Sequence, residues 1–442
     1  MNKKVLVLVL GGSGGAGFAS AADKLSSPLL GRPLVSYVAA AAAGVRPAAV
    51  FVAVEGTDGL SPDVLAAGPS PRPVPLALSG GAGRRGKGSS SLWPAAGPVL
   101  RKHLSSDVLV VPADRPLITS RTLKALLAAH RKNGCSLTLL SLGPDPDKDS
   151  IAAVRASDVA PLLAPLSRAG AKAGLRTIAA LLSARGRTVG LTELPDAEEA
   201  LRVAGRGDLA RAALVLRRRK NEDLLRRGVV LLDPASAWID WPVQVGAGTV
   251  IHPSVVIEGP SRLGKDCRVY PHVHIMNSRA GDRVRILSST VIEESRLEDE
   301  AQVGPFSRLR PGTVIRTGSK VGNFVEMKNT VFGPRSKAQH LSYLGDSLVE
   351  EDVNVGAGTI TCNYDGVRKN RTHIGAGAFI GSGTELVAPV KIGKRAYVAA
   401  GSTITKDVGP DSLAMSRARQ VEKPGWVLER LKKLRRGRTG RE

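Results

Sequence analysis

The stretch Val245-Gly246-Ala247-Gly248-Thr249-Val250-Ile251 opens a pattern in which an aliphatic side chain returns every six residues. A period of six fits neither an α-helix nor the alternation of an ordinary strand. It is typical of a parallel β-helix, in which each hexad forms one short side of a triangular coil and turns its aliphatic residue inward. One coil cannot bury its own core, so the region 241–410 is predicted to be a stack of coils. The pattern holds in three blocks: Val245, Ile251, Ile257, Leu263, Val269 and Ile275; Leu297, Val303, Leu309, Ile315 and Val321; and Ile374, Ile380, Leu386, Ile392, Val398 and Ile404.

The length of 442 residues predicts two or three domains. The cysteines Cys135, Cys267 and Cys362 are few, odd in number and far apart, which argues against a disulfide framework and against a zinc site. The apolar run Val5–Leu10 is too short to span a membrane and meets glycines without a signal-peptidase motif. A cytoplasmic protein without a membrane span is therefore expected.

Much of the formal net charge of +24 lies in the runs 217–220 and 226–227 and at 430–441, within the C-terminal tail 411–442. Such a balance can indicate a nucleic-acid partner. Aromatic residues make up only 3% and do not interleave with the basic runs, so base stacking is poorly supported. We interpret the runs as solvated helix faces and a basic tail with no nucleic-acid partner. A surface of this charge would still attract small phosphorylated substrates.

The N-terminal region 1–206 begins with a strand, Val5–Leu10, that runs into the glycine loop 11–17. A glycine loop after a strand can bring backbone N–H groups against a phosphate, which makes Gly11 and Gly14 candidate nucleotide-binding residues. Further strands are expected at 49–54 and 108–111, with helices near 34–43 and 120–130. This alternation predicts an α/β domain with a parallel, doubly wound sheet.

Asp114 follows the expected strand at 108–111, where ligands bind in such sheets, and is a candidate ligand for a nucleotide-bound metal. A turn-capping role for Asp114 is the alternative.

The loop Gly81–Lys87 is close to a phosphate-binding P-loop but continues with Gly88, not Ser or Thr. An ATPase is therefore not expected, although this loop could contact phosphate. A basic helix at 209–227 is expected within a linker, 207–240. The six-residue period is interrupted at 338–343 and at 361–372. Because loops that interrupt a solenoid usually carry its functional residues, the site is expected near these two segments.

Three long motifs, at 321–328 (VGNFVEMK), 340–346 (HLSYLGD) and 354–366 (NVGAGTITCNYDG), resemble the GlmU family very closely. Its members are bifunctional bacterial enzymes of UDP-N-acetylglucosamine synthesis. They combine glucosamine-1-phosphate N-acetyltransferase with N-acetylglucosamine-1-phosphate uridylyltransferase activity. The resemblance runs from about Gly304 to Arg417. It implies a Rossmann-like α/β nucleotidyltransferase domain, a left-handed parallel β-helix of hexapeptide repeats, and a homotrimer whose acetyl-transfer sites are shared between chains.

The resemblance also implies roles for residues of the β-helix. His340 would be the general base that takes a proton from the substrate amine, and Glu326 would orient and polarise it. The amine of glucosamine 1-phosphate would attack the thioester of acetyl-CoA directly; an acyl-enzyme on Cys362 is the alternative. Glucosamine 1-phosphate would contact Arg310, Lys328, Tyr343, Asn354, Asn363, Tyr364 and Lys369, and acetyl-CoA would contact Ala357, Ser382, Ala400 and Arg417.

The N-terminal half departs from the family pattern. Lys24 matches a family lysine, but the loop arginine that neutralises the triphosphate is replaced by Gly17. Asp114 matches the family's metal-binding aspartate, whereas Gly205 stands where the family has an asparagine ligand. Because nucleotidyl transfer depends on this charge stabilisation, Mg²⁺-dependent transfer from UTP is expected to be lost, weak or altered.

Three alternatives to an acetyltransferase alone remain open at this stage. The chain could be fully bifunctional and also transfer UMP from UTP to N-acetylglucosamine 1-phosphate. It could be a non-catalytic scaffold whose basic ends engage nucleic acid or a membrane. It could also acetylate another sugar.

Overall fold

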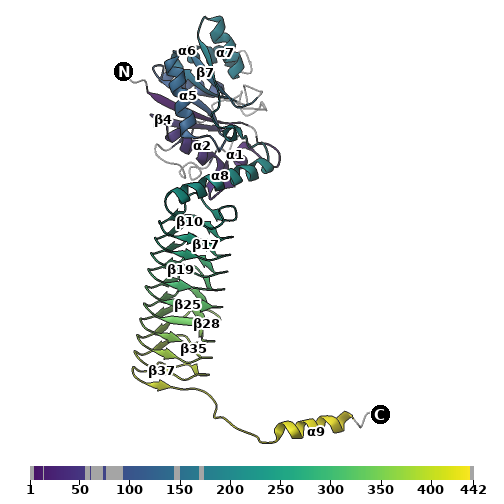
Figure 1. The fold of residues 1–442 in the computed structure, drawn as a ribbon, viewed down its shortest axis with the longest axis vertical. Coiled ribbons are helices and arrows are strands. Elements are labelled where there is room, and N and C mark those ends of the chain that lie inside the picture. The colour runs from purple at the N-terminus through teal and green to yellow at the C-terminus, as the bar shows by residue number, and fades with distance from the viewer. Residues whose placement is uncertain are drawn as a thin grey trace. The chain divides into compact units, whose positions relative to one another are not determined.

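The computed structural model describes residues 4–12, 14–54, 60, 73–75, 93–143, 150–168 and 174–438 (Figure 1). The loop around Gly81–Gly88, which the sequence suggested as a phosphate contact, lies outside these residues. The chain divides into two compact units, Met1–Arg262 and Leu263–Glu442. No helix of the described segments is long and apolar enough to cross a membrane.

The first unit contains a sheet with the strand order β5-β4-β1-β6-β8-β7-β9. Strands β5, β4, β1 and β6 are parallel, and β7 and β9 are parallel to each other. Strand β8 runs antiparallel to both β6 and β7. The strands are β1 (Val5–Gly11), β4 (Ala49–Val54), β5 (Val74–Pro75), β6 (Asp107–Pro112), β7 (Leu137–Ser141), β8 (Ser150–Arg155) and β9 (Val189–Thr192).

The predicted all-parallel sheet is therefore wrong at β8. A parallel neighbour needs a crossover of a dozen or more residues, usually through a helix. Only residues 142–149 separate β7 from β8, so the chain must return antiparallel. The predicted strands at 5–10, 49–54 and 108–111 are confirmed within one residue at each end.

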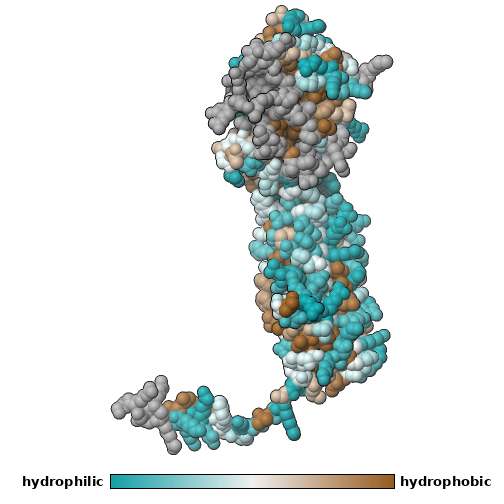
Figure 2. Space-filling model, turned by 180° about the vertical axis from the view of Figure 1, so that it is seen from behind, coloured by the Kyte–Doolittle hydropathy of each residue, from teal (hydrophilic) through white to brown (hydrophobic). Residues whose placement is uncertain are grey.

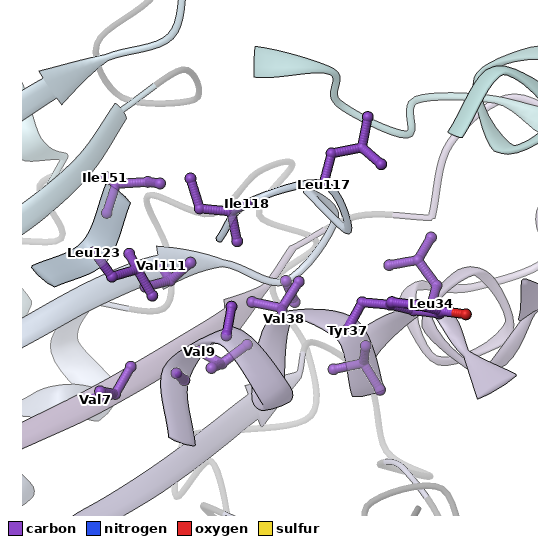
Figure 3. Close-up of a cluster of buried hydrophobic side chains, with 14 of the residues drawn as sticks. Val7, Val9, Leu34, Tyr37, Val38, Val111, Leu117, Ile118, Leu123 and Ile151 are labelled. Carbon is purple, nitrogen blue, oxygen red and sulfur yellow. The ribbon is translucent and has the colours of Figure 1, made fainter. Parts of the chain in front are cut away.

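Two hydrophobic cores lie on opposite faces of this sheet, because successive residues of a strand point to opposite sides. Val7 and Val9 of β1 pack against α2 and α5, as Figure 3 shows for Leu34, Val38 and Leu123. The intervening Leu6, Leu8 and Leu10 pack against α4, α6 and α7. The helices are α1 (Ala21–Ser26), α2 (Leu34–Ala43), α4 (Trp93–Lys102), α5 (Ser120–Lys132), α6 (Ala156–Arg168) and α7 (Leu175–Ala184), with a 3₁₀ turn at Ala197–Ala200 and a hairpin of β2 (Pro28–Leu29) and β3 (Arg32–Pro33).

Helix α8 (Arg206–Arg226) carries the basic runs and is followed by the first coil strands. Lys220 is only 7% exposed and its Nζ donates to the carbonyls of Trp241 (3.0 Å) and Val243 (2.7 Å). Burial lowers the pKa of Lys220 to about 8. The interpretation of these runs as solvated is therefore wrong for Lys220, which fixes α8 to the start of the coil. The coil strands of this unit are β10 (Val230–Leu231), β11 (Trp238–Ile239), β12 (Gln244–Val245), β13 (Val250–Ile251) and β14 (Val256–Glu258); β15 is Arg262–Leu263.

The second unit is a stack of coils with three parallel sheets. The first sheet contains β16 (Arg268–Val269), β19 (Arg285–Ile286), β22 (Gln302–Val303), β25 (Lys320–Asn323), β28 (Lys337–His340), β31 (Asn354–Val355), β34 (Phe379–Ile380), β37 (Tyr397–Val398) and β39 (Leu413–Ala414). The second contains β17 (His274–Met276), β20 (Val291–Glu293), β23 (Arg308–Leu309), β26 (Glu326–Lys328), β29 (Tyr343–Gly345), β32 (Ile360–Cys362), β35 (Glu385–Val387) and β38 (Thr403–Ile404). The third contains β18 (Arg279–Ala280), β21 (Arg296–Leu297), β24 (Val314–Ile315), β27 (Val331–Phe332), β30 (Ser347–Val349), β33 (Thr372–Ile374) and β36 (Val390–Ile392), and helix α9 (Trp426–Arg438) follows the coils.

The hexad residues fill the centre of the coils as predicted. All of them are buried except Val245, which is half-buried. Each aliphatic residue lies in register with that of the next coil, as in Leu309↔Met327 and Ile315↔Phe332. The outer surface of the coils that is seen in Figure 2 is mostly hydrophilic and is interrupted by apolar patches. The parallel strands are consistent with a left-handed β-helix.

Of the two predicted interruptions, only the second is an inserted loop. The loop 363–371 leaves the coil after β32 and is closed by a bridge between Tyr364 and Lys369. Near 338–343 the ladder continues, because Asn323 and His340 remain in register between β25 and β28.

Candidate functional sites

One corner of the β-helix carries a column of residues that includes His340. The ladder pairs Asn323 with His340. The same register, continued through β31, β34 and β37, stacks Ala357, Ser382 and Ala400 above His340. Successive coils lie about 4.8 Å apart, so Ser382 is two steps, about 10 Å, from His340. The predicted base and three of the predicted acetyl-CoA residues thus share one edge.

His340 is exposed at the end of β28, and its Nδ1 lies 2.9 Å from Oδ1 of Asn323. An amide oxygen can only accept, so this contact requires Nδ1 to carry the proton and leaves Nε2 with a free lone pair. Glu326 does not make this contact; it forms an ion pair of 2.8 Å with Arg310. The residue that orients the imidazole in this structure is therefore Asn323, which the sequence analysis did not single out. The role predicted for Glu326 remains a prediction.

Arg310 and Lys328 lie near Glu326 on the second sheet, and Lys369 of the loop 363–371 lies close to Lys328. The neighbouring Lys369 amine lowers the pKa of Lys328, and the charge of Arg310 adds to the effect. The Glu326 carboxylate hydrogen-bonds Arg310 and raises the pKa of the guanidinium. Two lysine side chains this close repel each other, although the charge of Asp346 partly offsets the effect at Lys328. Such a pair suits a site for a dianionic phosphate.

Tyr343 and Asn363 converge over Gly345. A Cβ on Gly345 would come within 2.5 Å of Tyr343 Oη and 2.7 Å of Asn363 Nδ2, so the position excludes a side chain. The Asp346 carboxylate accepts from Asn363 (2.5 Å) and Asn329 (2.6 Å), and fixes both amides. Asp346 was part of a quoted motif but was not predicted as a site residue. Its burial and two amide partners identify it as a positioning residue.

One predicted substrate residue lies on another sheet, whereas Tyr364 and the alternative nucleophile Cys362 lie next to Asn363 in the sequence. Asn354 is on β31 of the first sheet, in register with Lys337 and Phe379. Tyr364 is 62% exposed in the loop 363–371 and donates to the carbonyl of Gly366 (2.6 Å). Burial, with the nearby Glu385 carboxylate, raises the pKa of Cys362, which disfavours a thiolate nucleophile.

The acetyl-CoA candidates lie where the backbones of neighbouring coils approach closely. A Cβ on Gly381 would meet Ala400 N at 2.4 Å, and a Cβ on Gly356 would meet Ser382 N at 2.5 Å. Arg417 donates to the carbonyl of Ala400 (2.8 Å), which brings a guanidinium to the far end of the column. The edge beyond His340 therefore consists of small residues, among them Gly356, Gly381 and Ala400.

The N-terminal candidates lie around the end of β6. Asp114 Oδ2 accepts from Lys24 Nζ (3.0 Å) and from Arg202 Nε (3.1 Å). Burial raises the pKa of Asp114, but the charges and hydrogen bonds of these two cations outweigh it and leave the pKa below its ordinary value. Gly11 faces Leu25, and Gly14 faces the backbone of Ser20. Close packing is thus sufficient to explain both glycines, and their nucleotide-binding role remains a prediction.

The residues around Asp114 do not fit a divalent metal. One carboxylate oxygen already holds two side-chain cations. Gly205, at the expected position of the second ligand, has no donor side chain and pairs with Ala16 of the glycine loop. The described residues contain no group of three His, Cys, Asp or Glu side chains that could hold a metal ion. The family relationship favours Mg²⁺ in this domain, whereas the two cations on Asp114 argue against it there. The expectation of Mg²⁺ at Asp114 remains a prediction.

Comparison with known proteins places both halves of the chain. The model of the MobA-like NTP transferase domain matches residues 7–188, and that of the bacterial transferase hexapeptide (six repeats) matches residues 371–406. The "Bifunctional protein GlmU" of Pelobacter propionicus is 36% identical over 98% of this chain and 100% of its own length. The protein of that name from Thermotoga maritima is 43% identical over 74% of this chain and 79% of its own.

A solved structure, the 2-C-methyl-D-erythritol 4-phosphate cytidylyltransferase of Thermus thermophilus, aligns with 49% of this chain and 100% of its own, at 20% identity and a TM-score of 0.32. The similarity to the curated relatives, by contrast, extends through the N-terminal half, beyond the motifs that first suggested it. With a relative aligned over its whole length and a transferase domain in each half, the chain belongs to the GlmU family of bifunctional transferases.

Proposed function

We propose that the β-helix transfers the acetyl group of acetyl-CoA to the amine of glucosamine 1-phosphate and releases N-acetylglucosamine 1-phosphate and CoA. The observation that carries the proposal is the column in which Asn323, His340, Ala357, Ser382 and Ala400 follow one another along a single edge. It aligns a base with a strip of small residues that suits an extended thioester.

In this mechanism Nε2 of His340 accepts a proton from the substrate nitrogen as that nitrogen attacks the thioester carbonyl. The new C–N bond forms and the C–S bond breaks. Nε2 then returns the proton to the sulfur, which leaves as the thiol of CoA. Asn323 keeps the proton on Nδ1, so that the lone pair on Nε2 is available. Arg310, Lys328 and Lys369 hold the phosphate, because their positive charges are not balanced by Glu326 alone.

A homotrimer is part of the same proposal. Phe306, Phe324 and Leu341 form an apolar ridge beside His340 and are 54%, 56% and 63% exposed. The two phenylalanine rings stack at 5.6 Å. A second copy of the chain that covered this ridge would bury the apolar surface and close the site next to His340.

Uridylyl transfer from UTP is the second candidate function. The nucleotidyltransferase match and the family favour it, so an acetyltransferase alone is a narrower expectation than the comparisons support. The replacements at Gly17 and Gly205 and the contacts of Asp114 lead us to propose that this activity is weak or altered.

Two assays on the full chain test these proposals. With glucosamine 1-phosphate and acetyl-CoA we expect release of CoA thiol, and His340→Asn should lower kcat by about 10²–10⁴-fold. His272→Asn, a change of the same kind at another exposed coil position, should leave kcat unchanged. A loss below tenfold in His340→Asn would exclude His340 as the base. With UTP and N-acetylglucosamine 1-phosphate, pyrophosphate release as fast as acetyl transfer would refute the weakened second activity.

A further inference from the structure

The N-terminal domain has side-chain cations at the places where its family relationship leads one to expect a metal ion and a loop arginine. Lys24 approaches Asp114 from α1 and Arg202 approaches it from the segment before α8, both on the same carboxylate oxygen. The Lys24 side chain is 2% exposed and that of Arg202 is 33% exposed. The buried lysine therefore balances the carboxylate, and the guanidinium is the cation that can also reach a ligand.

A second guanidinium lies at the glycine loop. Arg206 Nε donates to the carbonyl of Gly17 (2.9 Å), and its guanidinium lies 5.3 Å from the centre of the Phe18 ring. A Cβ on Gly17 would meet the Arg206 side chain at 3.4 Å. The positive charge missing from the loop at Gly17 is thus supplied from the first residue of α8.

The loop itself is tied to the segment that carries these arginines. Ala16 N donates to the carbonyl of Ala204 (3.0 Å), and a Cβ on Gly15 would come within 2.3 Å of that oxygen. This hydrogen bond between Ala16 and Ala204 lies next to Gly205 in the sequence. Two cations therefore contact the Asp114 carboxylate, and a third, Arg206, lies at the glycine loop that is tied to the same segment.

We propose that this corner binds the phosphate chain of a nucleotide with Lys24, Arg202 and Arg206 and without a divalent metal, Arg202 holding the position at Asp114 that a metal would take. A planar guanidinium can donate two parallel hydrogen bonds to phosphate oxygens, which suits this replacement. Arg202 and Arg206 together leave a positive excess that a polyphosphate would neutralise. The inference concerns a different domain from the acetyl-transfer site, so it can fail while the proposed acetyltransferase stands.

The test measures binding of UTP to the full chain by calorimetry, in EDTA and in excess Mg²⁺ at constant ionic strength. We expect binding in EDTA, with a dissociation constant that changes less than about threefold when Mg²⁺ is added. Arg202→Gln should weaken binding in EDTA by about tenfold to a hundredfold, the value of a charge-assisted contact. Arg211→Gln removes an exposed arginine from α8, nine positions after Arg202, and should leave binding unchanged.

A second measurement follows Mn²⁺ by electron paramagnetic resonance, with the protein alone and with UTP. The Mn²⁺ spectrum of the unmodified chain should be the same as that of Asp114→Asn, both with and without UTP. The proposal is overturned by UTP binding that requires Mg²⁺, by the absence of UTP binding in EDTA, or by a Mn²⁺ site that Asp114→Asn abolishes. It is also overturned if Arg202→Gln and Arg211→Gln bind UTP equally well.

Discussion

Replacement of Asp114 by asparagine should destabilise the N-terminal domain even when no metal is present. The change keeps the shape of the side chain but removes its charge and leaves the Lys24 ammonium, whose side chain is 2% exposed, without a counter-ion. Removal of one partner of a buried ion pair costs about 3–5 kcal/mol. Arg202 is a third exposed and can turn towards water, so we expect the lower end, about 3 kcal/mol. For a domain of this size the loss corresponds to about 6–12 °C in Tm.

The loss of stability in Asp114→Asn should depend on pH in a defined direction. Lys24 and Arg202 hold the pKa of Asp114 below its ordinary value of 3.8. A carboxylate whose pKa is lowered by folding stabilises the protein above its unfolded pKa, and this contribution is lost as the pH falls through the folded pKa. The stability gap between the unmodified chain and Asp114→Asn should therefore be complete at pH 7 and shrink below about pH 4.

The assay is hydrogen exchange of the amides in β1 and β6, because unfolding of a chain with two units is not a single transition. Glu222→Gln serves as the matched control; its side chain is 54% exposed in an ion pair on α8, and its effect should stay within about 0.5 kcal/mol. The double variant Lys24→Met/Asp114→Asn should be more stable than Asp114→Asn, since it removes the stranded charge. Equal stability of Asp114→Asn and the unmodified chain, or a gap that appears only with Mg²⁺, would refute the reasoning.

Three further outcomes follow from the β-helix. Cys362→Ala should keep kcat for acetyl transfer within about twofold, because a thiol with a raised pKa is not the nucleophile; trapping of an acetylated Cys362 by mass spectrometry would contradict this. Arg310→Gln should raise KM for glucosamine 1-phosphate by about tenfold and leave KM for acetyl-CoA unchanged, as steady-state kinetics would show; equal effects on both would place Arg310 elsewhere. Phe332→Ala, at a fully buried position, should lower the free energy of unfolding by about 3–5 kcal/mol, measured in denaturant. Phe324 is 56% exposed, so Phe324→Ala should lower it far less in the isolated chain. Equal losses would mean that Phe332 does not point into the core of the coils.

The β-helix could be predicted from the sequence because its information is local and periodic. A six-residue repeat determines which side chain points inward, and Ile315, Phe332 and Val349 then stack without any further instruction. The antiparallel strand β8 carried no such signal. Its continuous apolar sequence is compatible with either direction, and the short connection after β7 decides between them.

The site residues that the sequence did not reveal, Asn323 and Arg202, are recognised only through contacts between residues far apart in the sequence. Asn323 stands 17 positions before His340, a separation that means nothing until the ladder is known to pair them. Arg202 is one arginine among many in a chain of net charge +24, and only the fold brings it to Asp114. Residue type and motif identified His340 and Asp114, but the partners that determine their chemistry come from other coils and other elements.

The two halves should respond differently to substitution, because their sites are built in different ways. In the β-helix each site residue is placed by the register of its own coil, so a position such as His340 keeps its geometry as long as the aliphatic core stacks. In the α/β domain the candidate site is assembled from three separate segments that meet at Asp114, and a change in any one alters the charge that the other two experience. The family resemblance leads one to expect an arginine at Gly17 and an asparagine ligand at Gly205. In our proposal, Arg206 and Arg202 from another segment take these two places.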